Sequence, residues 1–147
     1  FRVDLLEAVD DSRFLNKIID WAETNIKKGP ICVSTSADVD GVKRAQEILG
    51  RDGAAALADE ILGKSAAALK DLGVRKFVVA GGETSGQFFK SLDIGQVQVS
   101  SFDNLAGGYC HEASSDPMSI VTKAGGLGNE EFFFTALDRM RQADTQI

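Results

Sequence analysis

The chain has 147 residues, of which 44% are hydrophobic and 26% are charged, a size and composition typical of one ordinary globular domain. No run approaches the ~20 apolar residues that a membrane-spanning helix needs. Sixteen basic against twenty-two acidic residues give a net charge of −6, which argues against a nucleic-acid binder, since such proteins normally have a basic face. We therefore expect a single domain over residues 1–147 that binds neither membranes nor nucleic acids.

Hydrophobic spacing and turn residues predict helices that alternate with strands. Asp38 is the expected N-cap of the second helix. The polar segment Ser101 to Pro117 is expected to be a long loop. Because the strands are short, apolar and continuous, we predict a three-layer α/β/α fold with a mostly parallel sheet. The helices are expected over 14–27, 39–49, 54–72, 85–92 and 128–141, and the strands over 31–34, 76–80, 96–100 (an edge strand) and 118–122.

The two cysteines and the first residues of the chain give clues to the cellular location of the protein. Cys32 and Cys110 are too few for a disulfide framework or a zinc site. The charged first residues do not form a signal peptide, and we expect a cytoplasmic location. A start at Phe1 and not at Met indicates either a piece of a longer protein or an engineered chain.

Two glycine-rich turns are the main candidates for a binding site. The first reads Ala80-Gly81-Gly82-Glu83-Thr84-Ser85-Gly86, and the second Lys123-Ala124-Gly125-Gly126-Leu127-Gly128. Each follows an expected strand and precedes an expected helix, where ligands of α/β sheets bind. Glycine lets a ligand approach the backbone, and the N–H groups of a helix N-terminus attract anions.

The chemistry of these turns points to a phosphate or nucleotide site. Thr84 and Ser85 add hydroxyl donors, and Glu83 could accept from a ribose hydroxyl or a magnesium-bound water. The alternative is that the turns are only tight connections. Neither turn has the pattern of a Walker A loop or of a dinucleotide-binding fingerprint. A third segment, Ser34 to Asp38, also carries hydroxyls, but we favour a simple turn there with Asp38 as a helix cap.

The segment from Val79 to Gly86 resembles the most specific motif of a known family, the C-terminal nucleotide-binding domain of the four-carbon acid sugar kinases. The second turn with its Lys123, and the pair Phe132-Phe133 in the helix after it, match further family features. The resemblance runs from about Asn16 to Met140.

The resemblance implies a function that the residue patterns alone do not reach. Members transfer the γ-phosphoryl group of ATP to a tetronate or 3-oxo-tetronate, with Mg²⁺ as a cofactor. The implied ATP contacts are Gly82, Glu83, Thr84, Ser85 and Gly125, while Gly81, Gly86 and Gly126 would shape the turns.

The resemblance also implies a missing part. The sugar acid of these kinases binds mainly to an N-terminal domain with an Asp-Asp motif, and we do not equate Asp10-Asp11 with that motif. We therefore expect that this chain alone does not phosphorylate a sugar acid. Oligomeric state stays open, and a homo-oligomer is one option.

Some positions depart from the family pattern. Ala124 and Gly126 stand where relatives usually have Ser and Asn, so only backbone contacts would remain there. Lys123 could be a phosphate partner, although an exposed lysine is more often only solvated. We interpret His111 and Cys110 as incidental, and the catalytic base stays unassigned. The alternative function is a non-enzymatic interaction module, because some relatives carry the label of secreted effectors of plant-associated bacteria.

Overall fold

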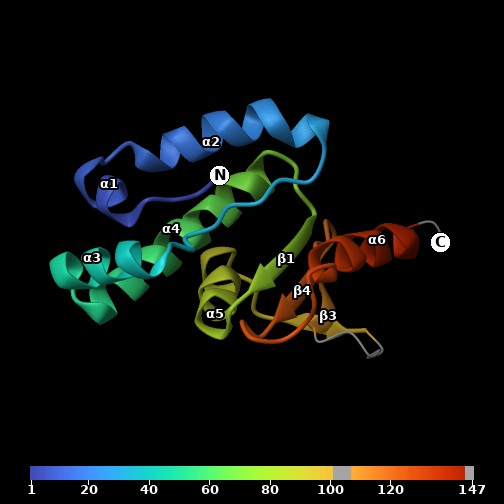
Figure 1. Ribbon diagram of the computed structural model, residues 1–147. Coiled ribbons are helices and arrows are strands. Elements are labelled where there is room, and N and C mark those ends of the chain that lie inside the picture. The colour runs from blue at the N-terminus through green and yellow to red at the C-terminus, as the bar shows by residue number, and fades with distance from the viewer. Residues whose placement is uncertain (101–106, 145–147) are drawn as a thin grey trace. The chain divides into compact units, whose positions relative to one another are not determined.

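The structure, a computed structural model, describes residues 1–100 and 107–144 and comprises two compact units, Phe1–Leu72 and Gly73–Ile147. The first unit is helical, and the second contains the sheet (Figure 1). The single domain over 1–147 stays a prediction. Within the described residues, no helix combines the length and the apolar character needed to cross a membrane.

The first unit is built from helices that pack on a small apolar core. Val3, Phe14 and Ile18 are buried there. The first helix was not expected from the sequence, although Asp4 caps it by accepting from two backbone N–H groups. The elements are α1 (Leu5–Asp10), α2 (Phe14–Asn25), the 3₁₀ turn η1 (Ile26–Lys28), α3 (Val39–Leu49) and α4 (Arg51–Asp71).

The predicted strand over 31–34 is wrong. The segment forms only one isolated bridge, between Arg2 and Ser34, with hydrogen bonds that join Ser34 to Phe1 and Val3. Three residues at the N-terminus offer too short a partner for a continuous ladder. An apolar β-branched run therefore remains an extended segment here.

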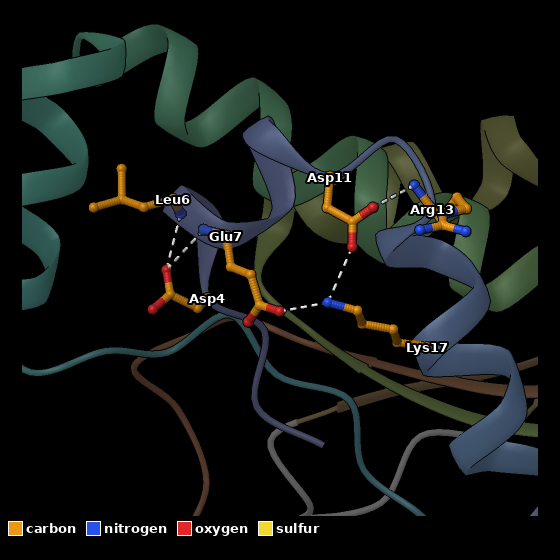
Figure 2. Close-up of polar contacts among 6 residues, drawn as sticks. All are labelled: Asp4, Leu6, Glu7, Asp11, Arg13 and Lys17. Carbon is orange, nitrogen blue, oxygen red and sulfur yellow. Dashed lines mark hydrogen bonds and ion pairs between the residues drawn. The ribbon is translucent and has the colours of Figure 1, made fainter.

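A network of polar contacts fixes the corner between α1 and α2 (Figure 2). Lys17 Nζ lies 2.6 Å from Glu7 Oε1 and 3.0 Å from Asp11 Oδ2, and Asp11 Oδ1 accepts from the Arg13 amide at 2.9 Å. The hydrogen bond donated by the Arg13 backbone amide lowers the pKa of Asp11, and Lys17 lowers it further. The hydrogen bonds to Glu7 and Asp11 raise the pKa of Lys17. The Asp11 carboxylate therefore has a local structural role.

The third candidate segment, residues 34–38, is a local turn that leads into α3. Asp38 Oδ1 accepts from the Gly41 amide at 2.7 Å, so the predicted N-cap is confirmed. Ser34 Oγ accepts from the Ser36 amide at 3.1 Å. Gly50, with a φ of 74°, separates α3 from α4.

The second unit contains a four-stranded mixed sheet in the order β1-β4-β3-β2. The pair β1–β4 is parallel, whereas β3–β4 and β2–β3 are antiparallel. The expected mostly parallel sheet is therefore wrong. A short connection joins β3 to β4, and neighbouring strands joined by a short hairpin must run antiparallel. The strands are β1 (Lys76–Ala80), β2 (Val97–Val99), β3 (Gly107–Glu112) and β4 (Ser119–Lys123).

The strand β3 lies inside the segment that we expected to be a loop. Residues 107–112 pair with both neighbouring strands, so that expectation is wrong for them. Residues 101–106 of the expected loop lie outside the described residues. The edge strand expected over 96–100 is confirmed as β2.

Two helices cover the parallel strand pair, α5 (Gly82–Ser91) and α6 (Phe132–Asp144). The α6 side chains share a core cluster with Val121 of β4 and Val78 of β1. The ring centroids of Phe88 in α5 and Phe77 in β1 are 5.1 Å apart. Successive side chains of a strand point to opposite faces, so the two helices cover opposite faces of β1 (Figure 1). A three-layer arrangement of the whole chain stays a prediction.

Candidate functional site

The two glycine turns lie side by side at the carboxyl ends of the parallel strands β1 and β4. β1 and β4 are parallel neighbours, and their last residues, Ala80 and Lys123, are paired in the register. The Gly81 amide donates to the Lys123 carbonyl at 2.9 Å, directly where both turns begin. The structure thus places the starts of the two turns side by side at the carboxyl ends of adjacent parallel strands, the usual place for ligands in α/β sheets.

The first turn depends on Gly81 for its shape. Gly81 has a φ of 108°, and a Cβ at this position would lie 3.2 Å from Thr84 Oγ1. The Gly81 carbonyl accepts from the Ser85 amide at 2.9 Å and from Ser85 Oγ at 2.7 Å. The Ser85 hydroxyl proton, which we expected to face a ligand, is therefore used inside α5 in this structure.

Gly82 and Glu83 form the exposed N-terminus of α5. The first N–H groups of a helix have no intrahelical acceptor, and the helix dipole adds partial positive charge there. A Cβ on Gly82 would meet nothing within 4 Å, and its φ is not left-handed. Glycine at this position is therefore not required by backbone shape or packing, whereas it would allow a ligand to approach the main chain.

The second turn is a β-turn closed by a 3.2 Å hydrogen bond from the Leu127 amide to the Ala124 carbonyl. Gly125 and Gly126 are at its centre, are exposed, and have no atom within 4 Å of a notional Cβ. Neither has a left-handed φ. Like Gly82, they leave the backbone accessible without being needed for its conformation.

Gly128 is the glycine that the second turn requires, and sequence reasoning did not assign it that role. Its φ is 89°, and a Cβ would lie 3.1 Å from Phe132 Cδ2 and 3.2 Å from Lys123 Cε. Of the three glycines expected to shape the turns, Gly81 has a left-handed φ, whereas Gly126 has none and Gly86 lies within α5. In the second turn that role falls to Gly128. A left-handed φ is a property of the folded backbone that spacing alone does not reveal.

Lys123 is not the exposed, solvated lysine that the sequence allowed. It is buried, and its Nζ donates to the Ala124 and Gly125 carbonyls at 3.0 Å each. The ammonium also lies 5.7 Å from the centroid of the Phe132 ring. A buried ammonium needs such partners, because desolvating an unpaired charge is costly.

His111 and Cys110 are separated from the glycine turns by the register of the sheet. β3 starts with Gly107 opposite Lys123, whereas His111 is opposite Ser119 at the other end of β4, roughly 13 Å away at the usual rise of a strand. His111 Nε2 lies 2.8 Å from Gln98 Oε1, a partner that the expected loop did not predict. Burial raises the pKa of the Cys110 thiol, which favours the protonated form over the nucleophilic thiolate. The interpretation of both as incidental to the site fits this placement.

The described residues contain no group of three or more His, Cys, Asp or Glu side chains that could hold a metal ion. In the two turns, Glu83 is the only carboxylate. Glu83 is exposed, and its position in the first turn of α5 favours a negative charge. The site therefore combines backbone N–H groups, one carboxylate and one internally bonded ammonium.

Comparison with known proteins agrees with this geometry. Residues 1–133 match the model of a family described as nucleotide-binding C-terminal domain. The chain is 31% identical over 140 residues to a Pseudomonas fluorescens protein named 3-oxo-tetronate kinase, covering 95% of this chain and 32% of the relative. A Burkholderia multivorans protein of the same name is 32% identical over 137 residues, covering 93% and 32%.

A solved structure shares the fold. The crystal structure of a Haemophilus influenzae protein superposes with a TM-score of 0.82 at 25% identity, covering 94% of this chain and 34% of that one. The present chain spans about a third of the length of the curated relatives it matches.

Proposed function

The chain belongs to the nucleotide-binding C-terminal domain family, and from this premise we propose that it supplies the ATP site of a kinase that phosphorylates a four-carbon sugar acid, a tetronate or 3-oxo-tetronate. The observation that carries the proposal is the meeting of two glycine turns at the carboxyl ends of β1 and β4. The relatives named 3-oxo-tetronate kinase support the substrate class.

The phosphates of ATP would be bound mainly by backbone N–H groups. The N-terminus of α5, at Gly82 and Glu83, offers N–H groups and the positive end of a helix dipole. Gly125 lies in the adjacent turn, and Gly82, Gly125 and Gly126 carry no side chain that would keep a phosphate away. Phosphoryl transfer needs mainly positioning and neutralisation of charge, which such groups supply.

Mg²⁺ would enter this site as part of the Mg·ATP complex. Mg²⁺ in such complexes keeps several waters and is held largely by the phosphates of the substrate. The Glu83 carboxylate would accept a hydrogen bond from a magnesium-bound water or from the ribose. When bound, Mg²⁺ neutralises charge on the phosphates.

The sugar acid would be bound mainly by the part of the kinase that corresponds to the remaining two thirds of the relatives' length. The 147-residue chain would then not turn over by itself. The cytoplasmic location stays an expectation.

Isothermal titration with Mg·ATP tests the ATP site, with Gly82→Asp as the decisive variant. A carboxylate at the N-terminus of α5 would repel the phosphates, and we expect affinity to fall about 100-fold or more. Gly95→Asp is the matched control, because Gly95 is equally exposed and open but lies before β2, at the opposite edge of the sheet. It should keep affinity within about twofold.

Two outcomes would contradict the proposal. Equal losses for both variants would show that the effect is only one of net charge. The second is a wild-type chain that binds no Mg·ATP together with a full-length protein that has no kinase activity. This pair of results would favour the alternative, a non-enzymatic interaction module.

A further inference from the structure

The second glycine turn is built around a buried ammonium group. Lys123 is 9% exposed, and its Nζ donates to two successive carbonyls of the turn, those of Ala124 and Gly125. The Phe132 ring lies beside the ammonium, with its centroid 5.7 Å from Nζ. Two of the three donors of this ammonium are therefore used inside the turn.

These two carbonyls determine where the next two amides point. The peptide bonds of the turn are trans, so the C=O and the N–H of each peptide unit point in opposite directions. The Ala124 carbonyl shares its peptide unit with the Gly125 N–H, and the Gly125 carbonyl with the Gly126 N–H. Because both carbonyls converge on Lys123 Nζ, both amides point away from it, on exposed residues.

Gly128 makes room for this arrangement. A Cβ there would lie 3.2 Å from Lys123 Cε and 3.1 Å from Phe132 Cδ2. The lysine stem, the phenylalanine ring and the bare backbone of Gly128 thus form one packed group beneath the turn. Two successive amides of a turn that point outward in this way can bind an anion.

We propose that Lys123 is a positioning residue of the nucleotide site: its ammonium holds the Ala124 and Gly125 carbonyls, and this directs the Gly125 and Gly126 amides to a phosphate oxygen of ATP. Lys123 does not itself contact the phosphate. The inference rests on the proposed ATP site and adds the group that orients its second turn. It also explains how the turn can bind phosphate with Ala124 and Gly126, which offer only backbone groups.

The orientation of the amides can be tested without a nucleotide. We suggest ¹H–¹⁵N NMR of the ligand-free chain for Lys123→Met, which keeps most of the stem but removes the ammonium. The Gly125 and Gly126 amide resonances should shift more than those of Gly82 and Glu83. The matched control is Lys90→Met, since Lys90 is exposed in the last turn of α5. Unchanged Gly125 and Gly126 amides in Lys123→Met would overturn the inference.

Titration with Mg·ATP and with inorganic tripolyphosphate tests the link to binding. We expect Lys123→Met to weaken both affinities about tenfold or more, and Lys90→Met to change them less than about twofold. Equal affinities of Lys123→Met and wild type would overturn the positioning role. A wild-type chain that binds neither ligand would overturn the proposed ATP site, while the ligand-free spectra still decide whether Lys123 orients the turn.

NMR of the Lys123 ammonium in the wild-type chain distinguishes a positioning role from direct contact with phosphate. This experiment needs no variant, so it remains possible if Lys123→Met fails to fold. The Lys123 ¹⁵Nζ resonance should keep its couplings to the Ala124 and Gly125 carbonyls when tripolyphosphate saturates the site. Loss of these couplings, with new coupling from Nζ to phosphorus, would show that Lys123 binds phosphate directly and would overturn the inference.

Discussion

The two glycine turns are similar in sequence but expose backbone N–H groups in different ways. In the first turn, the left-handed Gly81 follows the strand directly, and α5 starts at the next residue, so the N–H groups belong to a helix terminus. In the second turn, the open Gly125 and Gly126 come first and the left-handed Gly128 comes last, before α6 starts at Phe132. There the N–H groups belong to a β-turn that Lys123 holds.

This comparison separates two uses of glycine. Gly81 and Gly128 are required by the backbone, because each has a left-handed φ and little space for a Cβ. At positions 82, 125 and 126, neither the backbone conformation nor the packing of the described residues requires the residue to be glycine. If the second group serves a ligand, substitutions in the two groups should affect different measurements.

The largest expected loss of stability is that of Gly128→Ala. The new Cβ would contact Phe132 and Lys123 too closely, and a left-handed φ is itself unfavourable for alanine. We expect the free energy of unfolding to fall by about 2–4 kcal/mol, measured by urea denaturation with circular dichroism. Stability equal to wild type would mean that the contrast between the two groups of glycines is wrong.

A smaller loss is expected for Gly81→Ala. The cost is that of a left-handed alanine whose Cβ would lie 3.2 Å from Thr84 Oγ1 and 3.5 Å from Thr84 Cβ, and we estimate about 1–2 kcal/mol. The same urea experiment measures it. A loss greater than that of Gly128→Ala would reverse the expected order, since Gly128 has three close neighbours in place of two.

Gly82→Ala should separate folding from binding. Alanine at an open helical position stabilises by about 0.5–1 kcal/mol, because glycine loses more conformational freedom on folding. The added methyl group should nevertheless weaken Mg·ATP binding by about tenfold, since it lies where a phosphate would approach the backbone. Parallel urea denaturation and isothermal titration test both. A variant that gains stability and keeps full affinity would remove Gly82 from the site.

Gly126→Ala is the corresponding variant in the second turn. With an open position and no left-handed φ, its stability should stay within about 0.5 kcal/mol of wild type. Mg·ATP affinity should fall by a few-fold to about tenfold, measured by the same titration. Wild-type affinity here, with a loss for Gly82→Ala, would restrict the site to the first turn.

The smallest effect is expected in the first unit, where Asp11→Asn serves as a control outside the site. The folded pKa of Asp11 is lowered, so its stabilising effect is present above the ordinary carboxyl value of 3.8 and is lost as pH falls through the lowered pKa. Asp11→Asn should lack this part of the acid dependence of unfolding. Its Mg·ATP affinity at neutral pH should be unchanged, and a clear loss would show that the binding assay reports global damage.

Strong local signals made much of the fold predictable. The capping Asp38 and the apolar β1 were found at the residues that the structure shows, because each depends on its own segment. The strand β3 was missed, because its two glycines and its polar residues resemble a loop and its pairing comes from β4. The strand predicted over 31–34 was wrong for the opposite reason, since a β-branched segment without an adequate partner strand does not form a strand.

The site was predictable to the level of the turns but not of the individual roles. The position of glycines after strands identified both turns. The distinction between Gly126 and Gly128 depends on φ and on the Phe132 ring, which only the folded chain provides. Likewise, nothing in the sequence beside Lys123 indicates that its ammonium turns inward to two carbonyls.

The most direct test of the central claim is a ¹H–¹⁵N NMR titration of the 147-residue chain with Mg·ATP, carried to about 10 mM so that even weak binding is detected. We predict that the largest shifts fall on the amides of residues 81–86 and 124–128 together, with the same apparent affinity. Shifts concentrated in residues 34–38 or elsewhere, or no shifts in either turn, would contradict the claim that the two turns form one nucleotide site.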